Sequence, residues 1–205
     1  MTALEIETPH GPARAHLHPV AEPRGVLVLG HGAGGGVTAR DLVAAARAAQ
    51  GAGLSVALVE QPYRVAGRRS PAPAHQLDAA WLAVLARLRG DALSPGPLIV
   101  GGRSSGARVA CRTAEAAEAA AVLCLAFPLH PPGRPERSRH EELDAVAVPT
   151  LVVQGERDPF GRPEPGPARR VVLVAGDHGL RTGLDAVGEA VGEWIAGLGA
   201  LRSTG

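Results

Sequence analysis

Short apolar runs alternate with helical patterns along most of this chain, and the alternation limits the fold more than any other feature of the sequence. The run Gly25–Leu29 is continuously apolar, as expected of a strand buried on both faces of a sheet. Similar runs follow, most of them bounded by glycine or proline: Leu54–Val59, Leu98–Val100, Ala121–Ala126, Thr150–Gln154 and Val171–Val174. Each of these runs is a predicted strand.

Helical patterns fill the intervals between these strands. Thr38–Asp41 resembles a capping box and predicts a helix to about Gln50, where glycines follow. Apolar residues recur at helical spacing from His75 to Arg89 and from Leu184 to Leu198. The alanine-rich segment Ser105–Ala119 is a further candidate helix.

At the N-terminus, Ala3–Glu7 and Ala13–His18 flank a glycine–proline turn and predict a hairpin. The later strands alternate with helices. This order predicts the α/β class, with a mostly parallel central sheet flanked by helices on both faces. The pattern has no break, so residues 1–205 are predicted to form one domain.

Neither nucleic acid nor a membrane is an expected partner of this chain. The formal net charge is +1 and aromatic residues make up 2% of the chain. Nucleic-acid binding is therefore not expected, because base-stacking surfaces need aromatic side chains. The nearest basic cluster, Arg64, Arg68 and Arg69, is interpreted as a solvated loop. No apolar stretch reaches the roughly 18 residues that a membrane helix requires.

The cysteines and the first residues bear on the cellular compartment. Cys111 and Cys124 lie in apolar surroundings and are predicted to be buried free thiols. Residues 1–10 hold acidic side chains and no apolar run, so they do not resemble a signal peptide. Both observations predict a cytoplasmic protein, since free thiols are typical of that reducing compartment.

The segment Gly102-Arg-Ser104-Ser-Gly106 is a Gly-x-Ser-x-Gly pattern between a predicted strand and a predicted helix. In that context a tight, strained turn lifts the serine hydroxyl clear of the sheet, and the glycines permit close backbone approach. The N–H of Ser105 then lies at a helix N-terminus, where it can stabilise an oxyanion. The alternative is a glycine-rich turn that carries an ordinary surface serine.

A second glycine-rich segment, residues 31–36, follows the strand Gly25–Leu29. Because its glycines have no side chains to block the approach, this segment can direct main-chain N–H groups at a negative oxygen. A rival interpretation is a dinucleotide-binding loop. Gly30-x-Gly32-x-x-Gly35 has the spacing of that fingerprint, and Glu60 ends the next strand, where a ribose-binding acid belongs. However, the predicted helix begins at Thr38, several residues beyond the last of these glycines.

An aspartate and a histidine follow the last two predicted strands. Asp158 lies in a turn after Thr150–Gln154, and His178 lies between the final strand and the final helix. Such an aspartate can hold one imidazole tautomer and stabilise the imidazolium. Glu156 is the nearest alternative acid, and a simple Asp-Pro turn is the structural alternative.

Four features occur in the order that an α/β-hydrolase requires, each after its own predicted strand: the glycine loop, Ser104, Asp158 and His178. From about Gly25 to Leu198 the chain resembles the α/β-hydrolase superfamily, in its small, lidless, dienelactone-hydrolase-like branch. The resemblance implies that Ser104 is the nucleophile, Asp158 the acid and His178 the base. It also implies that the main-chain N–H groups of Ala33 and Ser105 form the oxyanion hole.

Five further residues are candidate substrate contacts: His31, Gly32, Arg103, His130 and Phe160. For Arg103, which adjoins the nucleophile and could favour an acidic substrate, the alternative is a salt bridge beneath the cleft. For His130, the alternative is packing against the neighbouring prolines. Dienelactone hydrolases use a cysteine nucleophile, so the serine here does not imply that particular activity.

The predicted function is cleavage of a small carboxylic ester or thioester through an acyl-enzyme, without metal or organic cofactor. The short connection between the strands ending near Glu60 and beginning near Pro97 leaves little chain for a lid. The segment between Asp158 and the last strand is proline-rich and too short for the usual helix, which leaves that side open or facing a second copy in a homodimer. A non-catalytic scaffold that binds a protein partner is the main alternative.

Overall fold

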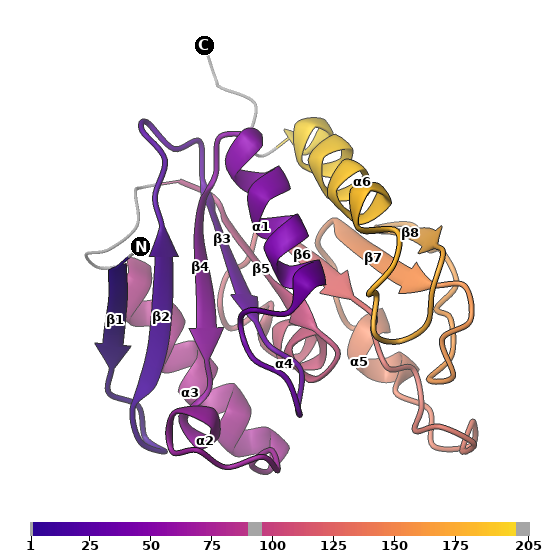
Figure 1. The fold of residues 1–205 in the computed structure, drawn as a ribbon, viewed down its shortest axis with the longest axis horizontal. Helices are drawn as coiled ribbons and strands as arrows, with labels where there is room; N and C mark the ends of the chain where they lie inside the picture. The colour runs from indigo at the N-terminus through magenta and orange to yellow at the C-terminus, as the bar shows by residue number, and fades with distance from the viewer. Residues whose placement is uncertain (1, 90–95, 200–205) are drawn as a thin grey trace.

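The strands lie side by side in one twisted sheet, seen in Figure 1. The computed structural model describes residues 2–89 and 96–199. The described strands are ordered β1-β2-β4-β3-β5-β6-β7-β8 across the sheet. Their bounds are β1 (Thr2–Ile6), β2 (Ala13–His18), β3 (Val26–Gly30), β4 (Ser55–Glu60), β5 (Leu98–Arg103), β6 (Ala121–Leu125), β7 (Thr150–Gly155) and β8 (Arg169–Val174).

The pairing directions confirm a mostly parallel sheet. β1 and β2 form the predicted antiparallel hairpin, and β2 also pairs antiparallel with β4. All the other neighbours, from β4 to β8, are parallel. The carboxyl ends of the parallel strands therefore meet at one edge of the sheet, which lies at the bottom of Figure 1 for β3 and β4.

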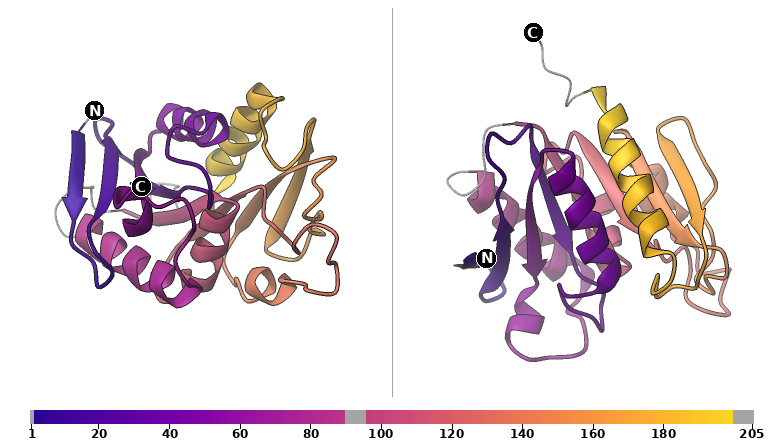
Figure 2. Two further views of the ribbon diagram at one scale, coloured as in Figure 1. Left: turned by 60° about the horizontal axis from the view of Figure 1, so that its bottom comes forward. Right: turned by 45° about the horizontal axis from the view of Figure 1, so that its top comes forward.

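Helices cover both faces of the sheet, as predicted, and Figure 2 shows the two layers from other sides. α1 (Arg40–Gly51) and α6 (Leu184–Gly197) pack together on one face. α3 (Ala74–Arg87), α4 (Ser105–Thr113) and α5 (His140–Asp144) lie on the other. The single-turn helix α2 (Pro62–Val65) follows β4 at the carboxyl edge.

Valine, leucine and alanine fill the two cores between the sheet and its helices, because aromatic residues are scarce. Trp81 on α3 is among the largest fully buried side chains. Cys111 and Cys124 are both free and buried, as predicted, with their sulfur atoms 3.5 Å apart. Close packing of branched and small side chains thus replaces the bulk that aromatic rings usually supply.

Two helix predictions are wrong in detail. The capping box at Thr38–Asp41 does not form: α1 begins at Arg40, and its N-cap residue, Ala39, makes no side-chain hydrogen bond. The Asp41 carboxylate is instead buried against Arg103. The helix predicted over Ser105–Ala119 ends at Thr113, and the chain then turns over residues 114–118 toward β6.

No helix occurs between Asp158 and β8 within the described residues 159–168, as expected. β8 is an edge strand of the described sheet, and its Leu173 is 46% exposed. A second copy on this side stays a prediction. The prediction of a single domain also stays a prediction. Residues 1, 90–95 and 200–205 lie outside the described residues. Nowhere in residues 2–89 or 96–199 is a helix long and apolar enough to cross a membrane, and the cytoplasmic location remains untested.

The N-terminus of α4 lies directly against the end of β3, and Gly106 makes this approach possible. A Cβ atom at Gly106 would lie 2.6 Å from the carbonyl carbon of Gly30 and 2.9 Å from the His31 carbonyl oxygen. Real Cβ atoms do not approach main chain this closely. Any larger residue at position 106 must therefore displace backbone.

We expect Gly106→Ala to lower the free energy of unfolding by about 2 kcal/mol or more, because the added carbon meets main chain that cannot move aside. Gly188→Ala in α6 is the matched control, since nothing lies within 4 Å of the added Cβ. There the higher helix propensity of alanine predicts a gain of about 0.5–1 kcal/mol. Urea denaturation of both variants tests this, and equal changes at the two positions would contradict it.

Candidate active site

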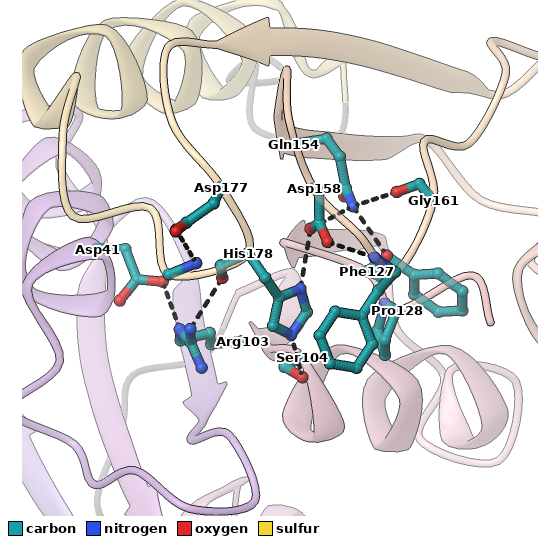
Figure 3. Close-up of polar contacts among 12 residues, drawn as sticks. Asp41, Arg103, Ser104, Phe127, Pro128, Gln154, Asp158, Gly161, Asp177 and His178 are labelled. Carbon is teal, nitrogen blue, oxygen red and sulfur yellow. Dashed lines mark hydrogen bonds and ion pairs between the residues drawn. The ribbon is translucent and has the colours of Figure 1, made fainter. Parts of the chain in front are cut away.

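Three polar side chains from separate loops meet at the carboxyl edge of the sheet. Ser104 follows β5, Asp158 follows β7 and His178 follows β8. Figure 3 shows the imidazole of His178 between the other two side chains. Because the strands are parallel, loops far apart in the sequence converge here.

Ser104 occupies a strained turn between β5 and α4. Its φ is 51° and its ψ is −107°, a combination that costs a non-glycine residue conformational energy. The surroundings hold the strain in place: the Ser104 N–H donates to the Leu125 carbonyl at 2.9 Å, and α4 begins at the next residue. This is the tight strand-to-helix turn that the Gly-x-Ser-x-Gly pattern predicts.

A continuous hydrogen-bond chain joins the three side chains. His178 Nε2 lies 2.8 Å from Ser104 Oγ, and His178 Nδ1 lies 2.8 Å from Asp158 Oδ2. With the Asp158 carboxylate ionised, Nδ1 carries the proton and donates it to that carboxylate. Nε2 is then free to accept a proton from the serine hydroxyl.

The Asp158 carboxylate is fully buried and held from both oxygens. Oδ1 accepts the Phe160 N–H at 2.8 Å, and Oδ2 accepts from the Gln154 side-chain amide at 2.8 Å, in addition to His178. The same amide nitrogen lies near the carbonyls of Phe127 and Gly161. Gln154 thus holds the loop that carries Asp158 in place, a role that the sequence analysis missed. The available signal was a polar residue inside an otherwise apolar strand.

Two main-chain N–H groups near Ser104, those of Ser105 and Ala33, have no acceptor among the described residues. Ser105 is the first residue of α4, so its N–H has no acceptor within the helix. The Ala33 N–H makes no hydrogen bond to any described residue. Gly32 lies against the elbow, because a Cβ atom there would come within 3.7 Å of Ser104 Cβ. Residues 31–36 are called the oxyanion loop below, after the role that the sequence analysis predicts for them.

Two aromatic side chains hold the main chain of the oxyanion loop. The Tyr63 hydroxyl donates to the Ala33 carbonyl at 2.9 Å. Burial raises the pKa of Tyr63 to about 12, which keeps this donor protonated at neutral pH. His31 Nδ1 lies 2.8 Å from the Gly32 carbonyl, and its Nε2 accepts the Gln61 N–H at 3.1 Å. The sequence analysis did not foresee Tyr63, since its partner belongs to another loop.

The neutral form of His31 is the one that these contacts require. Nε2 accepts a hydrogen bond and is therefore unprotonated, while Nδ1–H donates. Burial lowers the pKa of His31, partly opposed by its hydrogen bond to Gly32. Both ring nitrogens are occupied by main chain, so the contacts favour a role in shaping the loop over the predicted contact with substrate.

The other predicted substrate residues differ in their surroundings. Phe160 stacks on the His178 ring, with ring centroids 3.9 Å apart. His130 Nδ1 lies 2.9 Å from the Pro131 carbonyl, which fits the alternative of packing on prolines. Arg103 makes the salt bridge that was its alternative, with Nε 3.0 Å from Asp41 Oδ2. Contact of these residues and Gly32 with substrate stays a prediction.

The described contacts weigh against dinucleotide binding. The Glu60 carboxylate, expected on a ribose, lies 2.9 Å from His16 Nε2 and 3.7 Å from Arg14. The glycine loop does not open a helix either, since α1 begins only at Arg40.

Within residues 2–89 and 96–199, no group of three or more histidine, cysteine or acidic side chains could hold a metal ion.

The sequence matches a protein-family model described as an alpha/beta hydrolase domain over residues 23–183. A search of the sequence against curated proteins gives no match.

Several solved structures share the fold. A lidless α/β serine hydrolase from Xanthomonas campestris is 22% identical, with a TM-score of 0.78, and the match covers 95% of this chain and 93% of that one. Est1E from Butyrivibrio proteoclasticus, solved with ferulic acid bound, is 17% identical with a TM-score of 0.73, covering 95% and 98%. A dienelactone hydrolase from Anabaena variabilis is 18% identical with a TM-score of 0.73, covering 95% and 96%.

The buried, neutral His31 predicts a pH dependence of stability. Its pKa in the folded chain is lower than the 6.5 of an ordinary histidine, so the folded state binds fewer protons than the unfolded state. Stability from this group is therefore present above about pH 6.5 and declines as the pH falls below it. Urea denaturation from about pH 8 to 5 should show wild type losing stability faster than His31→Gln, whose side chain does not titrate. Parallel pH curves would contradict this.

Proposed function

This chain belongs to the α/β-hydrolase family, and on that premise we propose that it is a serine hydrolase that cleaves a small carboxylic ester or thioester. The observation that carries the proposal is the hydrogen-bond chain from Ser104 through His178 to Asp158, with both links 2.8 Å long. In this proposal the three residues act as nucleophile, base and orienting acid.

The reaction begins with proton transfer. His178 Nε2 takes the proton of the Ser104 hydroxyl as the oxygen attacks the substrate carbonyl, and the C–O bond of the new tetrahedral centre forms. His178 then donates that proton to the leaving alcohol or thiol as its bond to the carbonyl carbon breaks. A water activated by the same imidazole hydrolyses the acyl-enzyme and regenerates the serine.

The negative oxygen of the tetrahedral centre is stabilised by the N–H groups of Ala33 and Ser105. One such donor typically contributes a factor of about 10² to 10³ in rate. Tyr63 and His31 support this role, because their hydrogen bonds hold the carbonyls of Ala33 and Gly32 and so orient the loop's N–H groups.

Phe160 has a place in the same reaction. Its ring lies nearly parallel to the His178 imidazole, at an interplanar angle of 26°. When His178 accepts the serine proton, the resulting cation faces an aromatic ring, an arrangement worth about 0.5–1 kcal/mol at partly exposed sites. Phe160 also restricts the imidazole to the plane in which it reaches both Ser104 and Asp158.

The size of the substrate follows from the chain around the site. Within residues 61–89 the connection after β4 forms the four-residue α2 and the 14-residue α3, and α3 packs its apolar side chains into the core. Little chain is left there to enclose a long acyl group. The proposal of a short acyl chain is also in keeping with the lidless fold of the relative from Xanthomonas campestris.

An activated nucleophile should react with a fluorophosphonate, and intact-mass spectrometry measures the adduct. We expect one adduct on wild type and none on Ser104→Ala, since the reagent traps a serine whose proton has a nearby base. Ser70→Ala, which alters an exposed loop serine, is the control and should label like wild type. No adduct on wild type would sink the proposal and favour a non-catalytic scaffold.

Acyl-chain length is tested with nitrophenyl esters. We expect kcat/KM for the palmitoyl ester to be no higher than that for the acetyl or butyryl ester, because an added methylene contributes to binding only where a pocket receives it. Steady-state kinetics below the micellar concentration of the long ester measures the ratio. Faster turnover of the long ester would refute the short-chain assignment.

A further inference from the structure

Arg103 adjoins the nucleophile in the sequence, yet its side chain turns away from the reacting atoms. Its guanidinium lies among three segments of the active-site edge, and its side chain is 18% exposed. Nε lies 3.0 Å from Asp41 Oδ2 on α1, and Nη2 donates to the His178 carbonyl at 2.8 Å. Nη1 lies against Gly32 of the oxyanion loop, where an added Cβ would come within 2.7 Å of it. Figure 3 shows the first two of these contacts.

Asp41 holds the guanidinium in this place. Its carboxylate is 1% exposed, and its Oδ1 accepts the Leu42 N–H at 3.0 Å. A carboxylate so buried is costly unless a positive charge lies beside it, and Arg103 supplies that charge. Burial nevertheless raises the pKa of Asp41, with the charge of Arg103 acting in the opposite direction.

The contact with His178 fixes the main chain of the base. The loop 175–183 has local bonds of its own, such as the Gly179 N–H to Asp177 Oδ1 and the Thr182 hydroxyl to the Ala175 carbonyl. These bonds shape the loop but do not tie its main chain to β5, which ends at Arg103. The bond from Arg103 does, because Arg103 is the residue directly before the nucleophile.

We propose that Arg103 is a positioning residue, held by Asp41, that fixes the main chain of His178 and supports the oxyanion loop. It thereby keeps the base, the nucleophile and the N–H donors in their relative positions. The inference rests on the proposed serine-hydrolase function and adds to it a residue that touches no reacting atom. The planar fork of arginine suits this task. It presents Nε and Nη2 in a rigid arrangement toward two partners, whereas lysine offers one point charge on a flexible stem.

Arg112 on α4 provides a matched control. Its Nε and Nη2 bind the two carboxylate oxygens of Asp78 at 2.8 and 2.6 Å, and its side chain is 19% exposed. Arg112→Met and Arg103→Met each remove a partly buried arginine from an aspartate, although the side chain of Asp41 is 1% exposed and that of Asp78 is 23% exposed. Only the second removes a contact with the base and the oxyanion loop.

Steady-state kinetics on a short nitrophenyl ester gives the first measurement. We expect Arg103→Met to lower kcat by about 30- to 100-fold, with KM within about threefold of wild type, because displacing a catalytic group by about 1 Å costs rate rather than binding. Arg112→Met should keep a kcat within about threefold of wild type. Equal kcat values for the two variants would overturn the inference.

Two further readouts separate positioning from a general loss of stability. Arg103→Lys should recover only part of the lost kcat, since lysine cannot bind both partners in the arginine geometry. It also serves in place of Arg103→Met if that variant does not fold. The low-field proton signal of the His178–Asp158 hydrogen bond should be present in wild type and Arg112→Met, and shifted or lost in Arg103→Met. Full activity and an unchanged signal in Arg103→Lys would overturn the inference.

The design also separates this inference from the proposed function. If wild type turns over no ester and forms no fluorophosphonate adduct, the proposed function fails, while the proton signal still tests whether Arg103 positions His178. If wild type is active and Arg103→Met matches Arg112→Met in both kcat and proton signal, the function stands and the positioning role fails.

Discussion

The close approach of α4 to the end of β3 is the constraint on which the candidate site depends. Gly106 allows the helix N-terminus to lie against the carbonyls of Gly30 and His31. That contact brings the first N–H of α4 beside the oxyanion loop and holds Ser104 in its strained turn. In the proposed function both backbones must reach one substrate oxygen, and a side chain at position 106 would separate them, so packing of the fold and geometry of the proposed site share a single cause.

Two buried carboxylates near this contact, those of Asp158 and Asp41, are each paired, and the pairs help to define the site. Asp158 is bound by Gln154, Phe160 and His178, while Asp41 is bound by Arg103. Each pairing offsets the cost of removing a charge from water and at the same time fixes a loop. In the proposed reaction the scaffold therefore orients the reacting groups before any substrate arrives, an arrangement that lowers the reorganisation required in the transition state.

Much of the fold could be predicted because local patterns encode it. The parallel strands, the N-terminal hairpin and the missing helix before β8 all agree with the sequence analysis. The capping box at Thr38–Asp41 was wrong because a short-range pattern competed with a long-range one: the aspartate is used by Arg103 rather than by its own helix. The end of α4 was misplaced because alanine continues past Thr113, although the chain must turn there to reach β6.

The sequence by itself determined the order of strands and helices, and with it the convergence of Ser104, Asp158 and His178. Parallel strands bring their carboxyl ends to one edge whatever the side chains do elsewhere. Only the tertiary structure decided which partners the polar side chains take: that Tyr63 holds Ala33, that Gln154 holds Asp158, and that Arg103 turns to Asp41 and His178. Such partners lie on loops distant in the sequence, and hydrogen bonds depend on distance and angle in space, which no local pattern records.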